Sequence, residues 1–297
     1  MTAQVPAPLR VQLRVAARTD VGRVRLANED AFVAADLSQG EAFGVPSWAG
    51  KLEVGRRGLL LAVSDGMGGL KAGEVASSMA LSSLVQALAG RPPGAAGRDD
   101  LTGAVEVAHH KVWAEACFRG IDMGATLTAV HVRGGAAYVA EVGDSRAYLI
   151  RGGRITQLTK DQSYVQMLVD AGAVTPDEAR DFPERNVILQ AMGNQLDITV
   201  ALGRLELRQL DCLLLCSDGL TTKVTDDVMR DVVLTSPDLT VARDRLVDLA
   251  NARGGEDNTT VVLGGVSGDL PPPDVREPLE ATYRILDAFS AQTTSYS

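Results

Sequence analysis

Short apolar runs recur along the chain, and three of them end at an aspartate followed by glycine or serine. Residues 59–66 read LLLAVSDG, residues 139–145 read VAEVGDS and residues 213–219 read LLLCSDG. An apolar run that lacks polar alternation predicts a strand covered on both faces. A single Asp-Gly or Asp-Ser step is usually a turn, but three such steps after buried strands indicate that the aspartates have a common function.

The remaining hydrophobic pattern predicts helices and strands in groups. Helical spacing and end signals predict helices over 73–89, 100–118, 161–193, 225–233 and 239–252, and β-rich stretches predict strands at 11–16, 31–35, 59–64, 125–132, 136–143, 147–151, 197–207, 211–216 and 259–266. This order differs from the strict strand–helix alternation of a parallel doubly wound sheet. We therefore expect an α+β fold, with a central β-sandwich of two antiparallel sheets flanked by pairs of antiparallel helices.

The same pattern predicts how the chain is divided. One domain should span residues 10–267, with a long hairpin excursion at 36–58. Pro271-Pro272-Pro273 then marks a linker, so residues 268–297 should form a tail. Its apolar residues have helical spacing and predict a short helix, for which packing on the domain is favoured over binding a partner: Leu279, Tyr283, Leu286 and Phe289.

Composition and charge exclude several classes of function. The chain has 297 residues, of which 45% are hydrophobic, and a formal net charge of −9. Such a charge argues against binding to nucleic acid or to an anionic membrane surface. No apolar run approaches the roughly 20 residues of a membrane span, and the first residues lack the apolar centre of a signal peptide. We expect a cytoplasmic protein, and a monomer.

The candidate chemistry is acidic. A P-loop and a GxGxxG dinucleotide motif are both absent around residues 66–73. Two carboxylates ~4 Å apart repel by about 4 kcal/mol at an effective dielectric of ~20, so a carboxylate cluster needs protons, cationic side chains or metal. None of the three histidines lies in a motif and the three cysteines form no CxxC pair, so Mg²⁺ or Mn²⁺ fits better than zinc. The candidate ligands lie at predicted strand ends: Glu29, Asp30, Asp65, Asp144, Asp218 and Asp257.

Seven motifs, in order, carry a resemblance to a known family. They are GRVRLANED (22–30), SDGMGG (64–69), MGATLTA (123–129), GDSRAYL (143–149), TKDQS (159–163), CSDGL (216–220) and EDNTT (256–260). Together they resemble the metal-dependent protein serine/threonine phosphatases of type 2C, above all the bacterial members that oppose eukaryotic-type kinases. The resemblance covers residues 17–266 and implies the same sandwich fold.

The resemblance also implies roles for individual residues. Asp65 would bridge two Mn²⁺ or Mg²⁺ ions, and the main-chain carbonyl of Gly66 would help to bind the first. Asp218 and Asp257 would hold the second ion. Arg25 would bind the substrate phosphate, for which a guanidinium fork is well suited. Two further groups would act at the edge of the site: Glu29 and Asp30 through metal-bound waters, and Asp144, with Asp218, at a third and weaker ion.

The resemblance implies a two-metal hydrolysis of phosphoserine and phosphothreonine in proteins, in which a bridging water attacks phosphorus in line. Phosphorylated proteins and a cognate kinase would be the partners. Three positions differ from common family patterns. Met67 stands where animal and plant members carry histidine, and Gln162 and Phe182 stand where bacterial members often carry histidine. The last two lie in the segment that corresponds to the variable flap, about 160–190.

Other interpretations of the sequence stay open. The range of substrates could be narrower and consist of a single protein, a phosphorylated antagonist of an anti-sigma factor. The chain could also be a catalytically silent, metal-binding scaffold, although the complete set Asp65, Gly66, Asp218 and Asp257 argues against this. A hydrolase of non-protein phosphoesters is the third alternative, because a two-metal site does not name its substrate.

Overall fold

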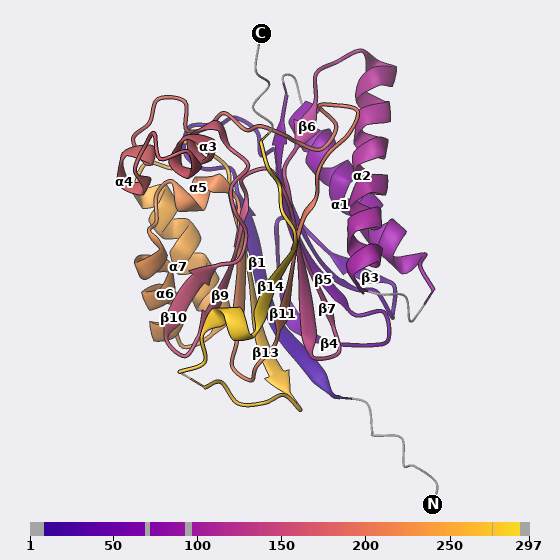
Figure 1. The fold of residues 1–297 in the computed structure, drawn as a ribbon, viewed down its shortest axis with the longest axis vertical. Helices are drawn as coiled ribbons and strands as arrows, with labels where there is room; N and C mark the ends of the chain where they lie inside the picture. The colour runs from indigo at the N-terminus through magenta and orange to yellow at the C-terminus, as the bar shows by residue number, and fades with distance from the viewer. Residues whose placement is uncertain (1–8, 69–71, 93–96, 275, 292–297) are drawn as a thin grey trace, which may run out of the picture.

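Two antiparallel sheets lie face to face in the computed structural model, which describes residues 9–68, 72–92, 97–274 and 276–291 (Figure 1). The first sheet has the strand order β10 (Arg154–Gln157), β9 (Arg146–Arg151), β12 (Cys212–Cys216), β13 (Thr259–Gly268), β1 (Val11–Asp20) and β4 (Ser47–Glu53). The second has the order β14 (Tyr283–Asp287), β11 (Ala201–Glu206), β8 (Ala136–Val142), β7 (Leu127–Arg133), β5 (Leu59–Met67), β2 (Asp30–Asp36) and β3 (Glu41–Phe43), while the short β6 (Gly124–Ala125) pairs with β5.

Helices cover the outer face of each sheet. Figure 1 shows α1 (Ala72–Ala89) and α2 (Gly97–Arg119) on one side of the sandwich, and α6 (Asp226–Thr235) and α7 (Leu239–Ala252) on the other. Three short helices, α3 (Tyr164–Asp170), α4 (Pro176–Ala179) and α5 (Asp218–Thr221), lie at one end of the sandwich, and a 3₁₀ turn spans Leu279–Ala281. The predicted α+β sandwich is confirmed.

Strand β5 shows why its sequence lacks polar alternation. Leu59, Leu61 and Val63 pack in the core between the two sheets, while Leu60 and Ala62 pack beneath α1 and α2. Because successive side chains of a strand point to opposite faces, a strand between two buried faces must be apolar at every position. The long runs in the sequence are therefore central strands.

Two predictions for connecting segments are wrong. Residues 161–193 form only α3 and α4, with irregular backbone elsewhere, although the capping box at Thr175 and Glu178 is present. Residues 36–58 do not form a hairpin of their own, because β3 pairs with β2 in one sheet and β4 pairs with β1 in the other. This segment crosses between the sheets, and a pattern of local hydrophobicity cannot reveal such a crossing.

The predicted tail helix is also wrong. Tyr283–Asp287 forms strand β14, which pairs antiparallel with β11 and covers what would otherwise be an exposed sheet edge. The Tyr283 hydroxyl donates to the Leu158 carbonyl at 2.6 Å, and Thr282 accepts from the buried Arg151 at 2.8 Å. Part of the predicted tail, residues 292–297, lies outside the described residues.

Ending the chain at Asp274 should lower the melting temperature by about 4–10 °C. The truncation removes the β14 ladder and both side-chain bonds; each hydrogen bond contributes about 1 kcal/mol, and 1 kcal/mol corresponds to roughly 2–4 °C for a domain of this size. Differential scanning calorimetry measures the change. Ending the chain at Ala291 keeps β14 and is the matched control, and equal melting temperatures for the two truncations would show that β14 does not stabilise the domain.

Candidate active site

The strand periodicity brings two aspartates to one end of the sandwich interior. On β2, Phe32 and Ala34 face the inter-sheet core, and Asp30 continues this series; on β5, Asp65 continues the series of Leu61 and Val63. Asp30 and Asp65 are direct partners in the β2–β5 register. Two acidic side chains of neighbouring strands therefore lie side by side where the apolar core ends.

Two hydroxyl groups of the first sheet fix Asp30. The hydroxyls of Ser217, which follows β12, and of Thr260, on β13, each donate to Asp30 Oδ2 at 2.7 Å. Asp30 is 4% exposed, and its Oδ1 has no hydrogen-bond partner among the described residues. A buried carboxyl oxygen without a partner is costly unless a proton or a cation satisfies it.

Asp218, which follows β12 of the first sheet, and Asp144, which lies in the connection between β8 and β9, approach the same place. Asp218 begins α5 directly after β12, and its Oδ1 is likewise buried and lacks a partner in the described part of the chain. Burial and the repulsion of Asp257 raise the pKa of Asp218 to about 6, although the charge of Arg25 opposes that rise. Burial and the charge of Asp218 raise the pKa of Asp144. Burial, followed by the charges of Asp30 and Asp218, raises the pKa of Asp65 well above its ordinary value. The aspartates therefore repel one another as a group.

An arginine lies against this acidic group. The Arg25 Nη2 atom donates to Asp257 Oδ2 at 2.8 Å, and Asp65 and Glu29 add to its electrostatic stabilisation. This ion pair joins residues 232 positions apart in the sequence. Burial raises the pKa of Glu29, whereas the charge of Arg25 opposes that rise. The structure thus brings together the seven charged residues that the sequence singled out: Arg25, Glu29, Asp30, Asp65, Asp144, Asp218 and Asp257.

Asn258 was not among the predicted site residues, yet it positions several of them. Its side-chain amide donates to the carbonyls of Val21 and Ala27, and its Oδ1 accepts from the Glu29 backbone at 2.8 Å. These bonds fix the loop that carries Arg25. Asn258 lies within the EDNTT motif, so the sequence did point to this position. The hydrogen bonds of a single side-chain amide, however, produce no recognisable pattern in a sequence.

The position after Asp65 must be glycine for a steric reason. A Cβ at Gly66 would overlap the Gly73 carbonyl and lie 2.7 Å from the Glu29 carbonyl oxygen, which accepts the Gly66 amide at 3.1 Å. The start of α1 therefore packs against this turn more closely than any side chain would allow. Gly69, the last glycine of this motif, lies outside the described residues.

The donors of this site fit hard divalent cations. The site offers carboxylate and carbonyl oxygens, which suit Mg²⁺ and Mn²⁺, and two of its buried carboxylate oxygens have no partner in the described ranges. No group of three or more Asp, Glu, His or Cys side chains among the described residues is arranged so that it could hold an ion as it stands. The Arg25 guanidinium forms an ion pair with one of these carboxylates, that of Asp257.

A cleft opens beside the aspartates. It has a volume of about 680 Å³ and lies between α5 and the segment that carries α3 and α4, with Asp144 and Asp218 in its wall. Arg180 and Arg185 line it from the flap segment, and Arg146 is held by Asp161 through two bonds of 2.6 and 2.7 Å. The cleft is large enough to admit a peptide side chain beside the carboxylates.

Comparison with known proteins agrees with this geometry. The family model described as protein phosphatase 2C matches residues 48–247. The chain belongs to this family. The serine/threonine protein phosphatase PstP of Mycobacterium tuberculosis is 38% identical over 257 residues, which cover 86% of this chain and 45% of PstP. Protein phosphatase PhpP of Streptococcus pneumoniae is 35% identical, with 84% of this chain and 96% of PhpP covered.

Solved structures of family members have the same fold. The catalytic domain of PstP in complex with two manganese ions has a TM-score of 0.72 and 36% identity, and the match covers 86% of this chain and 99% of that domain. Stp1 of Staphylococcus aureus has a TM-score of 0.76 and 30% identity, and covers 90% and 100%. The chain thus spans less than half the length of full PstP but nearly all of its catalytic domain. No helix in the described part of this chain is both long and apolar enough to cross a membrane.

The raised carboxyl pKa values predict an unusual pH dependence. Burial raises the pKa of Asp30 to about 7. An aspartate whose folded pKa is raised contributes stability that is full below its ordinary pKa and is lost as pH rises through the folded value. Without divalent cations, the melting temperature should therefore fall between pH 5 and pH 8, and Mn²⁺ should restore more of it at pH 8 than at pH 5.5 because it replaces protons.

Scanning fluorimetry across this pH range tests the prediction, with Asp30→Asn as the control. The asparagine has no titrating proton, so the fall should be shallower in that variant. A melting temperature that rises from pH 5 to pH 8 in the presence of chelator would contradict the assignment.

Proposed function

We propose that this protein is a metal-dependent protein serine/threonine phosphatase that removes phosphate from phosphoserine and phosphothreonine with two Mn²⁺ or Mg²⁺ ions. The convergence of five aspartates at one end of the sandwich, two of them with unpartnered buried oxygens, is the observation that carries the proposal. Family membership supports it, as do the names of PstP and PhpP and the two manganese ions bound to PstP.

The residues of the site divide between two ion positions. Asp65 would bridge both ions, the Gly66 carbonyl would help to hold one, and Asp218 and Asp257 would hold the other. Glu29 and Asp30 would bind ordered waters around them, and Asp144 with Asp218 would hold a third, weaker ion. When bound, the ions supply positive charge to the phosphoryl group and lower the pKa of water at the site.

The side chains of this site supply binding and orientation. Asp30 is fixed by Ser217 and Thr260, so its free oxygen has a defined direction. Arg25 can exchange Asp257 for two phosphate oxygens, because its side chain is 52% exposed and lies beside the aspartates. No covalent phosphoenzyme is needed, since every aspartate of the group is assigned to metal or its waters.

Replacing Arg25 with alanine should lower kcat/KM for a phosphopeptide by about 10- to 100-fold, the value of one charge-assisted contact to phosphate. Steady-state kinetics on a phosphothreonine peptide measure the loss. Arg23→Ala, two residues away on the exposed loop, is the matched control and should change kcat/KM less than about 2-fold. Equal effects of the two substitutions would assign the phosphate contact elsewhere.

The proposal extends to the setting of the enzyme. We assign the catalytic domain to residues 10–267, with the flap at about 160–190, and take the protein to act as a monomer in the cytoplasm of a bacterium. Its partners are phosphorylated proteins and the serine/threonine kinase whose products it reverses.

A substrate panel separates this proposal from its alternatives. Phosphothreonine and phosphoserine peptides, a phosphorylated anti-sigma-factor antagonist and glucose 6-phosphate are compared at one Mn²⁺ concentration. We expect kcat/KM for the peptides to exceed that for the sugar phosphate by at least about 100-fold, the scale on which specific contacts discriminate. Comparable values for the sugar phosphate would favour a non-protein phosphoester hydrolase, and turnover of the antagonist alone would narrow the substrate to it.

A further inference from the structure

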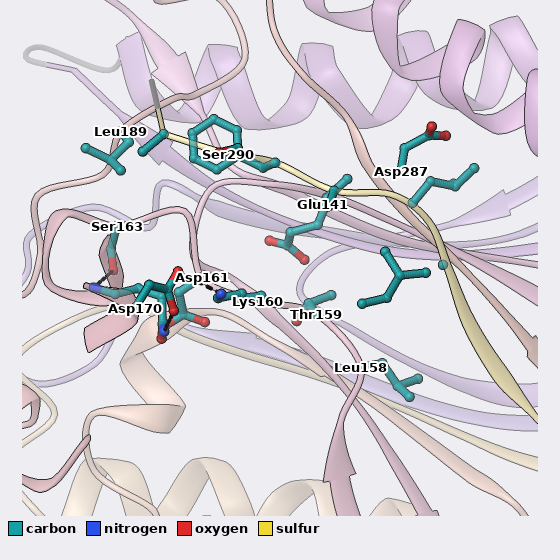
Figure 2. Close-up of a pocket in the computed structure, with 18 of the residues that line it drawn as sticks. Glu141, Leu158, Thr159, Lys160, Asp161, Ser163, Asp170, Leu189, Asp287 and Ser290 are labelled. Atoms are coloured by element: carbon teal, nitrogen blue, oxygen red, sulfur yellow. Dashed lines mark hydrogen bonds and ion pairs between the residues drawn. The ribbon is translucent and has the colours of Figure 1, made fainter. Parts of the chain in front are cut away.

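A second cavity lies between the flap segment and the C-terminal strand, apart from the aspartate group. Its volume is about 440 Å³, and its walls come from β8, from residues 158–171, from β11 and from the tail at residues 283–291 (Figure 2). A volume of this size accommodates a small organic molecule. None of the residues assigned to the proposed hydrolysis lines this cavity.

Glu141 lies at the centre of this cavity's wall. Ala137 and Val139 of β8 face the core between the sheets, and Glu141 continues the same series, so an acidic side chain occupies a core-facing position. Its Oε2 accepts from the Thr128 hydroxyl at 2.9 Å. Glu141 is 2% exposed, and its Oε1 has no hydrogen-bond partner in the described part of the chain. Figure 2 shows its carboxyl group pointing into the space between the Lys160–Asp161 segment and the tail.

The other charged groups of the cavity already have partners. Lys160 pairs with Asp170 at 2.7 Å, Asp161 pairs with Arg146 at 2.6 Å, and Asp287 pairs with Arg98 at 2.6 Å. The lining therefore carries four carboxyl groups but a single lysine, and that lysine is already paired. Glu141 is the acidic group whose oxygen stays without a partner among the residues described.

Most of the remaining lining is apolar, although Thr159, Ser163, Gln166 and Ser290 add uncharged polar groups. The apolar part includes Leu158, Leu189, Leu202, Tyr283 and Phe289. Such walls fit an aliphatic or aromatic body, and the excess of carboxyl groups repels an anion. A buried carboxylate is stabilised when a cation with N–H donors pairs with it.

We propose that this cavity binds a small organic cation, an ammonium or guanidinium head on an apolar body, with the head at Glu141 Oε1. The occupant would lie between the flap and β14. Asp161, Ser163 and Gln166 line both this cavity and the cleft beside Asp218, so the occupant would contact the same helix α3 that borders the cleft.

Three compounds that share one body and differ only in the head test the proposal: 1-naphthylmethylamine, 1-naphthalenemethanol and 1-naphthoate. Isothermal titration calorimetry on the full-length protein measures each affinity without any turnover, so the result does not depend on whether the protein is a phosphatase. We expect the amine, a cation at pH 7, to bind about 10- to 100-fold more tightly than the alcohol, as one charge-assisted contact predicts. The carboxylate should bind most weakly.

Matched variants locate the contact. Glu141→Gln should abolish the preference for the amine over the alcohol, while Asp287→Asn, which removes an exposed carboxylate of the same cavity, should keep it. Ala201→Leu, which fills the cavity from β11, should weaken all three compounds and provides a second test if Glu141→Gln does not fold. Asp218→Asn should leave the amine's affinity unchanged, because its carboxyl lies in the other cleft.

Four results would overturn the proposal: no binding of the amine, equal binding of all three compounds, a preference for the amine that survives Glu141→Gln, or unweakened binding of all three compounds in Ala201→Leu. A loss of amine binding in Asp218→Asn alone would place the cation in the aspartate group instead and would equally reject this site.

Discussion

Replacing Asp218 with asparagine should lower kcat on a phosphothreonine peptide by about 1,000-fold or more. The substitution removes a charge that the proposed second ion needs, and metal-supplied charge is worth several kcal/mol to the transition state, with each 1.36 kcal/mol a factor of ten in rate. The loss should appear in kcat at saturating Mn²⁺. Steady-state assays over a range of Mn²⁺ concentrations measure it.

The same substitution should leave the protein as stable as before, or more stable. Asp218 repels Asp257, Asp65 and Asp144, and its Oδ1 accepts no hydrogen bond within the described ranges. An amide of equal size ends that repulsion, so the metal-free melting temperature should not fall. Asp227→Asn, at an exposed position on α6, is the control and should change neither quantity. A variant that keeps more than about a tenth of wild-type kcat would remove Asp218 from the proposed mechanism.

Replacing Asp211 with alanine should destabilise the fold by about 3–5 kcal/mol. Arg151 donates to both carboxylate oxygens of Asp211 at 2.7 Å, and the side chains are 8% and 0% exposed. Without Asp211 the guanidinium remains buried, and its other close acceptors among the described residues are Thr282 and the Glu206 carbonyl, with Glu277 at 3.9 Å. An unpaired buried charge of this kind is costly because the protein cannot solvate it.

Urea denaturation followed by circular dichroism measures this change. Glu206→Ala, which breaks the pair with Arg204 at a side chain that is 48% exposed, is the control and should cost less than about 1 kcal/mol. The tail should be affected too, because Arg151 joins Thr282 to the first sheet. A loss of less than about 1 kcal/mol in Asp211→Ala would show that the pair contributes little net stability.

The central strands and their aspartates follow from local sequence. Residues 59–63 of β5 and residues 31–35 of β2 are all apolar, so the pattern predicted that both strands are buried. Asp65 lies two residues after the first run, and Asp30 lies directly before the second. Helix α7 was also predicted at its observed bounds, because its apolar stripe is followed by two glycines. The residues that specify these elements lie close together in the sequence, so a local pattern is enough to predict them.

The failures have a common physical origin in long-range pairing. Tyr283 and Leu286 have a spacing that suits a helix, but the free edge of β11 offers backbone partners that a short isolated helix cannot match. Arg25 and Asp257 meet across 232 residues, so only the family resemblance linked them before the structure did. Glu141 could have been recognised from the sequence, because it is a charged residue in a strand whose alternate residues, Ala137 and Val139, belong to the core.

The dependence of phosphate release on divalent cations tests the central claim most directly. The protein is stripped with chelator, assayed on a phosphothreonine peptide, and then titrated with Mn²⁺ or Mg²⁺ while bound metal is counted. We expect no release in chelator and recovery of activity as about two ions bind per chain. Release that persists in chelator, or a folded protein that releases no phosphate with either metal, would contradict it.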